Sequence, residues 1–360
     1  MPLSKNRVII ACAGSGKTTQ LVEEALAHQD RRILIVTYTI SNTREIINKF
    51  GELNSGVPKH VDVMTWYGFL LRECARPYQR SMYTDKRIES IQFKQKQSAR
   101  YSSETDIKRH YFMRGEFIYS DKIAKFVVKC NEVSGQLVTS RLGQVYTDIF
   151  IDEFQDLAGW DLDVIEMLMQ SEISITMVGD PRQHTYATNN APKNKQHLGA
   201  NVLNLVEKWR KKRLCKVESR DKTYRCNSAI CEFANRLWPG LPPMESLQSN
   251  ETGHDGIFLV GEDVVPEYIK CFKPQILRYD KRTKNYGFDA MNFGVAKGRQ
   301  FKRVLVVPTK GIKKYLQNGD IKEVKKSKDK FYVAITRAMH SVAFVYNDSS
   351  AIVPNRWQLT

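Results

Sequence analysis

The first half of the chain alternates short, almost wholly apolar runs with longer segments of helical spacing. The runs are Val8–Ala11, Ile33–Thr37, Val61–Thr65, Ile149–Asp152 and Ile173–Val178. Runs that are apolar on both faces and rich in β-branched residues are expected of strands buried in a parallel sheet. Gly16–His28 and Ser41–Phe50 repeat apolar residues at helical intervals. This alternation predicts an α/β fold with a doubly wound parallel sheet flanked by helices.

The second half repeats the pattern on a smaller scale from about Leu205. It opens with a basic run, Lys208–Arg213, and strand-like runs follow at Ile257–Val260, Val304–Val307 and Val342–Tyr346. We therefore expect a first α/β domain made of residues 1–75 and 130–204, and a second one over residues 205–360.

Residues 76–129 lack the buried-strand pattern and are polar. They contain 13 Lys and Arg against 6 Asp and Glu, a net charge of 13 − 6 = +7. We interpret this segment as a small basic helical insertion in the first domain. It is either a surface that faces nucleic acid or simply a solvated subdomain, and its charge favours the first.

The whole chain carries the same excess, with a net charge of +17 over 360 residues. Such an excess points to a polyanionic partner, because neutralised phosphates release counterions, although it also serves solubility. The seven Cys residues form no CxxC pair, which argues against a disulfide framework or a zinc site. We find no signal peptide and no apolar run of membrane-spanning length, and expect a soluble cytoplasmic protein.

A glycine-rich turn connects the first predicted strand to the first predicted helix. Residues 11–18 read ACAGSGKT. Glycines at this junction let backbone amides surround phosphates, and the start of the helix adds its dipole. In such a P-loop Lys17 reaches the β- and γ-phosphates and the Thr18 hydroxyl binds Mg²⁺, so the motif predicts ATP and Mg²⁺ as ligands.

Two acidic residues follow the apolar run at 149–151. In open α/β sheets, ligands bind at the carboxyl ends of the strands. Asp152 would hold Mg²⁺, directly or through water. Glu153 would act as the base that deprotonates the attacking water. A simpler role, in which these acids only cap the following helix, is weaker beside the P-loop.

Further motifs follow in a fixed order, and with them the chain resembles the UvrD/Rep/PcrA helicases of superfamily 1. The two DNA-contacting motifs of the family resemble residues 35–42 (IVTYTISN) and 63–69 (VMTWYGF). The second ATPase motif resembles residues 152–156 (DEFQD). The third to sixth motifs resemble, in order, residues 178–183 (VGDPRQ), 223–225 (TYR), 296–301 (AKGRQF) and 332–338 (YVAITRA). The resemblance spans residues 8–346 and implies two RecA-like P-loop NTPase domains.

The resemblance also implies roles for individual residues. Gln183 would sense the γ-phosphate, Arg225 and Arg337 would place guanidinium groups on it, and Tyr224 would stack on the adenine. The implied nucleotide contacts are Ala13, Gly14, Ser15, Gly16, Lys17, Thr18, Thr19, Tyr224, Gly298 and Gln300. The implied DNA contacts are Tyr38, Thr39, Asn42, Thr65, Trp66 and Tyr186. Because the arginines belong to the second half, ATP would draw the two halves together.

The chain also departs from the family pattern. Thr19 stands where relatives often carry an adenine-contacting Arg, which puts base selectivity in doubt. Thr188 occupies the position of a base-stacking Trp, and Gln300 replaces a Glu. Only about 60 residues separate Cys226 from Asn292, so the large second accessory domain is missing.

Three hypotheses follow. The leading one is a DNA-dependent ATPase and helicase that moves along single-stranded DNA with 3′→5′ polarity, as the resemblance implies. The second is a nucleic-acid-stimulated ATPase that serves as regulatory subunit of a larger assembly, with a nuclease or another protein as partner. The third is a motor directed to RNA, because a groove that follows the backbone suits either strand.

Overall fold

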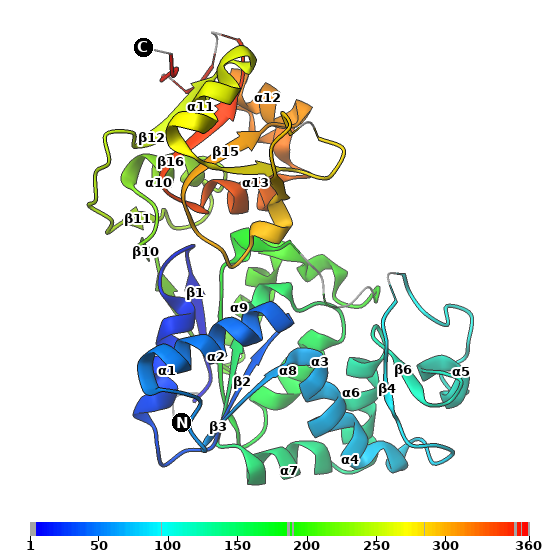
Figure 1. Cartoon of the computed structure of the whole chain (residues 1–360). Helices are drawn as coiled ribbons and strands as arrows, with labels where there is room; N and C mark the ends of the chain where they lie inside the picture. The colour runs from blue at the N-terminus through cyan, green and yellow to red at the C-terminus, as the bar shows by residue number, and fades with distance from the viewer. Residues whose placement is uncertain are drawn as a thin grey trace. The chain divides into compact units, whose positions relative to one another are not determined.

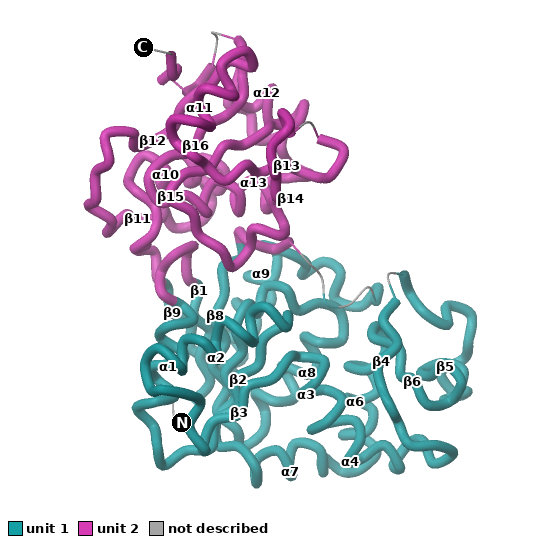
Figure 2. The backbone as a smooth tube through the Cα atoms, viewed as in Figure 1, with its two compact units in different colours: residues 1–10, 17–181, 186–219 teal, residues 11–16, 182–185, 220–360 magenta. Residues whose placement is uncertain are grey.

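A computed structural model describes residues 5–94, 96–185, 188, 191–283, 285–348, 351–353 and 355–358 (Figure 1). The chain divides into two compact units (Figure 2). Unit 1 contains residues 1–10, 17–181 and 186–219, and unit 2 contains residues 11–16, 182–185 and 220–360. No helix in the described part of the chain is both long and apolar enough to cross a bilayer. All seven cysteines are free thiols, and only Cys271 is exposed.

Unit 1 is built on a six-stranded sheet with the strand order β3-β2-β7-β8-β1-β9. The strands are β1 (Arg7–Ala11), β2 (Ile33–Thr37), β3 (Val61–Thr65), β7 (Asp148–Asp152), β8 (Ser174–Gly179) and β9 (Lys216–Arg220). The pairs β2–β3, β2–β7, β7–β8 and β8–β1 are all parallel. Every residue of β2 and β7 is buried, as their Ile- and Val-rich sequences predict. The predicted parallel α/β sheet is confirmed.

Helices cover this sheet and complete one continuous apolar core. They are α1 (Lys17–Ala27), α2 (Ile40–Asn54), α3 (Trp66–Phe69), α4 (Arg76–Tyr78), α6 (Ile123–Val133), α7 (Leu137–Val145), α8 (Asp161–Met169) and α9 (Val202–Lys211). A π-helical turn, Leu70–Ala75, connects α3 to α4. Thr39 caps the start of α2 by accepting a hydrogen bond from Asn42, and Ser55 ends it in the left-handed conformation.

The insertion at residues 76–129 is not purely helical, contrary to the prediction. It contains a small sheet of order β4-β6-β5, made of β4 (Ser90–Gln92), β5 (Phe112–Met113) and β6 (Phe117–Tyr119), and the helix α5 (Ile107–Tyr111). Arg114 and Gly115 adopt positive φ between β5 and β6, so a tight turn joins these antiparallel strands. The charged composition of the segment gave no indication of these short strands.

The two predicted domain boundaries also differ from the structure. The boundary at 129/130 falls inside α6, whose Phe126 packs in the core of unit 1. The boundary at 204/205 falls inside α9. The Trp209 indole of α9 is buried in unit 1 and donates to Glu166 Oε2 at 3.1 Å. The basic run 208–213 therefore belongs to the first unit rather than opening the second, because the apolar face of α9 packs in that core.

Unit 2 is built on a five-stranded parallel sheet of order β12-β16-β15-β13-β14. Its strands are β12 (Gly256–Val260), β13 (Gln275–Arg278), β14 (Ala290–Asn292), β15 (Phe301–Val307) and β16 (Ala338–Val345), and β10 (Lys222–Thr223) pairs with β11 (Glu245–Ser246) separately. Its helices are α10 (Ser228–Asn235), α11 (Val265–Phe272), α12 (Lys310–Asn318) and α13 (Lys328–Ile335). The three predicted strands are confirmed, whereas β13 and β14 were not predicted because they are short and partly polar.

Candidate nucleotide and nucleic-acid sites

The P-loop has the strand–turn–helix geometry that phosphate binding requires. It leaves β1 and enters α1 at Lys17. Gly14 and Gly16 have φ values of +74° and +79°, which a side chain would strain. The hydroxyl of Ser15 is buried without a hydrogen-bond partner among the described residues, so a donor is left for an incoming oxygen. Thr18 and Thr19 follow in the first turn of α1.

The acids after β7 lie beside that first turn within unit 1. Thr18 Oγ1 lies 3.3 Å from Asp152 Oδ2, and Asp152 Oδ1 accepts the Glu153 amide at 2.9 Å. Burial, and then the negative charge of Glu153, raise the pKa of Asp152. A cation would relieve both effects, and an all-oxygen donor set of hydroxyl and carboxylate suits Mg²⁺. These residues therefore fit the predicted metal.

Glu153 itself adopts a left-handed conformation with φ of +58°. This conformation is uncommon for a residue with a β-carbon and often marks functional positions. The Gln155 side-chain amide donates a hydrogen bond to Glu153 Oε2. Neighbours on the same short turn therefore fix the backbone and one carboxylate oxygen of Glu153.

In unit 2 the structure brings two of the predicted phosphate-directed residues into contact. Arg337 Nη2 donates to Gln183 Oε1 at 2.8 Å. The buried guanidinium of Arg337 also donates to the carbonyls of Val333 and Arg299, at 3.2 and 3.3 Å. Arg225 donates to the Thr336 carbonyl at 3.2 Å, next to Arg337 in the chain. Both arginine side chains are thus held around the 336–337 junction at the end of α13.

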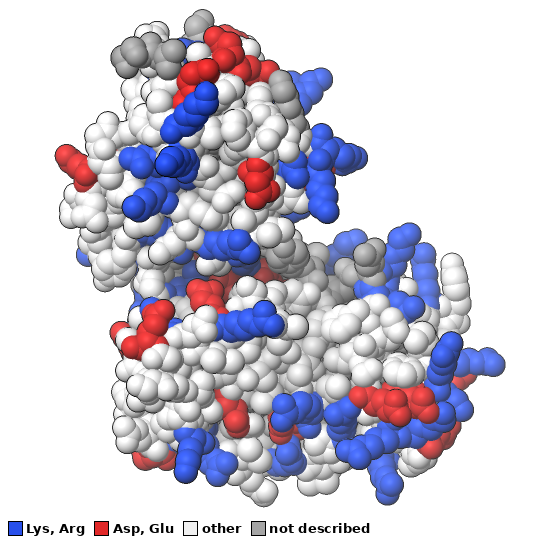
Figure 3. All heavy atoms as spheres, in the orientation of Figure 1, with Lys and Arg blue, Asp and Glu red and all other residues white. Residues whose placement is uncertain are grey.

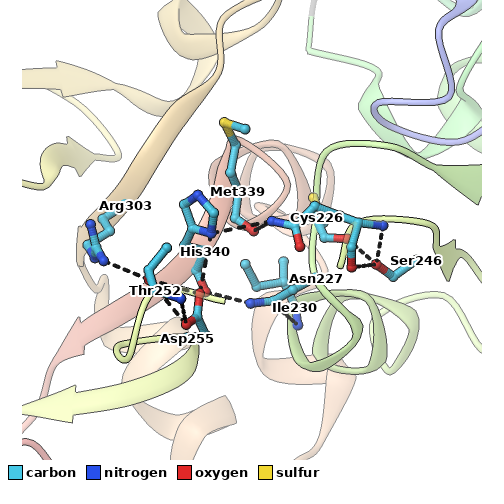
Figure 4. Close-up of polar contacts among 10 residues, drawn as sticks. Cys226, Asn227, Ile230, Ser246, Thr252, Asp255, Arg303, Met339 and His340 are labelled. Carbon is cyan, nitrogen blue, oxygen red and sulfur yellow. Dashed lines mark hydrogen bonds and ion pairs between the residues drawn. The ribbon is translucent and has the colours of Figure 1, made fainter. Parts of the chain in front are cut away.

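A polar network behind this junction holds the loop of Arg225 against β16 (Figure 4). Asn227 caps α10 through Ile230, and its side chain donates to the His340 carbonyl at 2.6 Å. The His340 ring in turn lies 3.3 Å from Asp255 Oδ1. Ser246 donates to the Cys226 carbonyl at 2.8 Å. The network ties the segment after Arg225 to the strand that begins just after Arg337.

The 223–225 segment also packs against the P-loop turn, whose residues 11–16 belong to unit 2. The Tyr224 amide donates to the Gly14 carbonyl at 3.0 Å. A β-carbon on Gly14 would lie 2.5 Å from both Arg225 Cβ and Thr223 Oγ1, so only glycine fits there. Ala13 is buried in the unit 2 core, whereas the Tyr224 side chain is 66% exposed. Gly298, with φ of +81°, and the exposed Gln300 lie in the loop before β15.

An aromatic pocket of about 380 Å³ lies in unit 1 at the carboxyl ends of β2 and β3. Its lining residues are Tyr38, Thr39, Ile40, Thr65, Tyr67 and Phe93. The rings of Tyr38 and Tyr67 are 6.1 Å apart, and those of Tyr67 and Phe93 are 5.1 Å apart and edge to face. Tyr38, Thr39 and Thr65 were predicted DNA contacts. Sequence reasoning missed Tyr67 and Phe93, although Tyr67 is the next residue after a predicted contact.

The predicted DNA contact at Trp66 needs correction. Trp66 is 1% exposed, and its indole donates to Asp161 at 2.9 Å inside the core, so this side chain cannot stack on a base. Thr188, at the family's stacking position, is buried and donates to the same Asp161. Asn42 and Thr39 bond to each other in the cap of α2, and their side chains are partly exposed. Tyr186 lies outside the described residues.

Comparison with known proteins places part of the chain in a family. Residues 78–197, a third of the 360 residues, match the UvrD/REP helicase N-terminal domain. This segment includes nearly all of the insertion, the acids Asp152 and Glu153 at the end of β7, and Gln183. No curated protein matches the chain.

A solved structure of a viral helicase shares the fold, and two further structures are similar at lower scores. The crystal structure of arterivirus nonstructural protein 10 (helicase) superposes with a TM-score of 0.50 at 14% identity, over 95% of this chain and 60% of that one. The same helicase in complex with DNA gives 0.49 at 14% identity, over 95% and 61%. PRRSV helicase gives 0.45 at 15% identity, over 95% and 52%. The chain thus spans about 60% of the length of the first of these helicases.

The family match includes the DEFQD segment at 152–156 and the VGDPRQ segment at 178–183, and the P-loop precedes the matched residues in the sequence. This third of the chain is therefore similar to the UvrD/REP helicase N-terminal domain.

Proposed function

We propose that this protein is an ATP-driven motor that moves along single-stranded DNA with 3′→5′ polarity and unwinds duplex ahead of it. The observation that carries the proposal is the approach of Thr18 to Asp152, with Glu153 held beside them. This arrangement joins a P-loop to a buried carboxylate and a positioned base, which is what hydrolysis of a nucleoside triphosphate requires.

In this proposal the amides of Ala13–Gly16 and the Lys17 ammonium bind the phosphates. Thr18 and Asp152 would hold Mg²⁺, which would supply positive charge to the phosphate oxygens. Glu153 accepts a proton from the attacking water. Its fixed neighbours orient it, since a positioned base contributes about 10²–10⁴-fold in rate.

Gln183, Arg225 and Arg337 act on the γ-phosphate of the same nucleotide. The support is that hydrogen bonds hold all three side chains around residues 336–337: Arg225 donates to the Thr336 carbonyl, and Arg337 donates to Gln183. Two guanidinium groups and an amide are therefore grouped together. Tyr224, with its exposed ring, stacks on the base, and Thr19, Gly298 and Gln300 complete the nucleotide contacts. Because Thr19 cannot form the contacts of an Arg, we expect GTP to be hydrolysed as well as ATP.

The aromatic pocket receives bases of the single strand. Tyr38, Tyr67 and Phe93 offer ring faces and edges, and such stacking is tolerant of sequence. Burial raises the pKa of the Tyr67 phenol well above its usual range, so the hydroxyl stays protonated and donates to the Thr188 carbonyl. This hydrogen bond holds one wall of the pocket in place.

Thr188 favours a second candidate function. Its side chain is buried and cannot replace the stacking Trp of relatives, so one base platform is lost. Weaker binding of single-stranded DNA is compatible with a nucleic-acid-stimulated ATPase that regulates a partner such as a nuclease. Unwinding by the purified chain alone would count against this alternative, whereas co-purification with a second protein would support it.

The deciding experiment measures ATP hydrolysis by the purified chain with and without single-stranded DNA. We expect strong stimulation by DNA, abolished in Lys17→Ala and retained in Lys49→Ala, a control on the exposed face of α2 where Lys49 pairs with Glu52. A rate of hydrolysis that does not change when DNA is added would favour the partner-dependent alternative.

A competition binding experiment with DNA and RNA of the same length tests the choice of nucleic acid. Equal competition by the two would remove the preference for DNA.

A further inference from the structure

A second cavity, of about 310 Å³, lies in unit 1 where the insertion meets the segments of Trp160 and Lys193. It shares no lining residue with the aromatic pocket and contains none of the proposed nucleotide contacts. Four of its lining side chains are cationic: Arg100, Lys122, Lys125 and Lys193. Its volume is at the lower end of the range for small-ligand sites.

Lys122 is the central group of this cavity. It is 7% exposed, and its ammonium lies 3.3 Å from His110 Nε2. None of the described carboxylates forms an ion pair with it. Burial, and then the charge of Lys122, lower the pKa of His110, so the ring is neutral and accepts the hydrogen bond. A buried ammonium whose hydrogen-bond partner is neutral is costly unless an anion binds to it directly.

The negative charges of Asp121 and Glu104 act on Lys122, but neither carboxylate forms an ion pair with it. Both oxygens of Asp121 are occupied by Ser98, at 2.9 Å from its amide and 2.6 Å from its hydroxyl. Glu104 is paired with Lys125. Lys193 is paired with Asp163 at 2.6 Å and lies 3.6 Å above the Trp160 ring.

Arg100 and Lys122 therefore remain without a carboxylate partner among the described residues. The lining carries four cations against two carboxylates, a formal charge of 4 − 2 = +2. Lys122 is also the N-cap of α6, which has no side-chain cap, so the positive end of the helix dipole adds to this charge.

We propose that this cavity binds a phosphate group of the nucleic-acid strand, with Lys122 at its base and Arg100 at its rim. The proposal rests on the proposed nucleic-acid function. The exposed Arg100 can contact a nucleic-acid strand that passes over the insertion. On this part of the surface Lys and Arg side chains outnumber Asp and Glu (Figure 3). The chemistry is that of a phosphate monoester or diester, and free inorganic phosphate shares it.

The test uses the full chain and three variants. Lys122→Met removes the charge and keeps the volume of the buried stem, and Arg100→Gln alters an exposed side chain that does not threaten folding. Lys108→Gln is the control, because Lys108 is an exposed lysine of the same insertion outside the cavity. The first probe is inorganic phosphate, titrated at constant ionic strength, and the second is a single-stranded oligonucleotide, titrated over a range of KCl concentrations.

We expect the wild type to bind phosphate and both cavity variants to lose this binding. The slope of log K against log[KCl] for the oligonucleotide should fall by about 0.7 in each cavity variant and stay unchanged in Lys108→Gln. The cavity variants could lose phosphate binding while the salt dependence of oligonucleotide binding stays unchanged. This result would mean that the cavity binds only free phosphate, and it would overturn the assignment to the nucleic-acid strand. An equal slope change in all three variants, or no phosphate binding by the wild type, would overturn the cavity itself. A chain that binds phosphate here but no oligonucleotide would refute the proposed function separately.

Discussion

The P-loop with its acids and the aromatic pocket both lie at carboxyl ends of strands in one sheet, yet they are built differently. The first consists of two short segments, each continuous in sequence: residues 11–18, which begin at the last residue of β1, and Asp152 and Glu153 at the end of β7. The pocket joins residues from the end of β2, from α3 and from the insertion. The proposed catalytic groups depend on local backbone geometry, whereas the proposed binding surface depends on which distant segments meet.

This difference predicts two kinds of mutational response. Changes at the nucleotide-directed groups should reduce the rate of hydrolysis and leave the fold intact. Changes at the aromatic pocket should reduce DNA affinity by modest amounts, because each ring contributes separately.

The largest effect is expected for Arg337→Lys. The Arg337 guanidinium bonds to Gln183 and to two backbone carbonyls at once, and an ammonium cannot reproduce that fork. We expect ATP turnover to fall by about 10³-fold or more, as for arginine fingers in related enzymes. Steady-state ATPase assays measure it, with Arg236→Lys, an arginine just after α10, as control. A loss smaller than tenfold in a folded variant would exclude Arg337 from the phosphate.

Glu153→Gln should lower the turnover number by about 10²–10⁴-fold while ATP binding persists. Glutamine keeps the size of the side chain and removes its basicity. Equilibrium titration with a fluorescent ATP analogue separates binding from hydrolysis. Glu172→Gln is the matched control, since that side chain is fully exposed. Normal turnover in Glu153→Gln would move the role of base to another residue.

How far the sequence could predict these sites follows from the same contrast. The strands β1, β2, β3, β7 and β8 were predicted within two residues, because buried parallel strands are apolar throughout. The P-loop and acids are contiguous motifs, so the amino-acid sequence alone identifies them. Trp66 and Tyr67 could not be told apart, because the direction of each side chain depends on how α3 packs, with Trp66 on Asp161 and Tyr67 beside Phe93.

The insertion at residues 76–129 shows that amino-acid composition does not predict short strands or distant contacts. Its charge excess was plain, but β4, β5 and β6 are only two or three residues long, and β4 pairs with the distant β6. Phe93 is separated from Tyr38 by more than 50 residues. No local pattern could place it in the pocket, because the meeting depends on the tertiary packing of the insertion.

Phe93→Ala and Trp66→Phe provide a direct test of the pocket. Phe93 is 63% exposed, so its loss should leave stability unchanged and weaken single-stranded DNA binding by about 1–3 kcal/mol. Trp66→Phe removes a buried hydrogen bond and should lower the free energy of unfolding by about 1–3 kcal/mol. Fluorescence anisotropy and urea unfolding measure the two quantities. The reverse pattern, with DNA affinity lost mainly in Trp66→Phe, would contradict the pocket.

The smallest effect concerns Asp161, the buried acid beneath the pocket that accepts hydrogen bonds from Trp66 and Thr188. Burial raises its pKa to about 6, above the ordinary value near 4. The folded protein therefore keeps a proton that the unfolded chain has lost, so this stabilising contribution is complete below about pH 4 and disappears as pH rises through about 6. The free energy of unfolding should fall by about 1–2 kcal/mol across this window from this group alone. Urea unfolding of wild type and Asp161→Asn from about pH 4.5 to about pH 7.5 isolates it. In the Asn variant the free energy of unfolding should lack this decrease with pH. The same dependence on pH in both proteins would show that Asp161 does not titrate in this range.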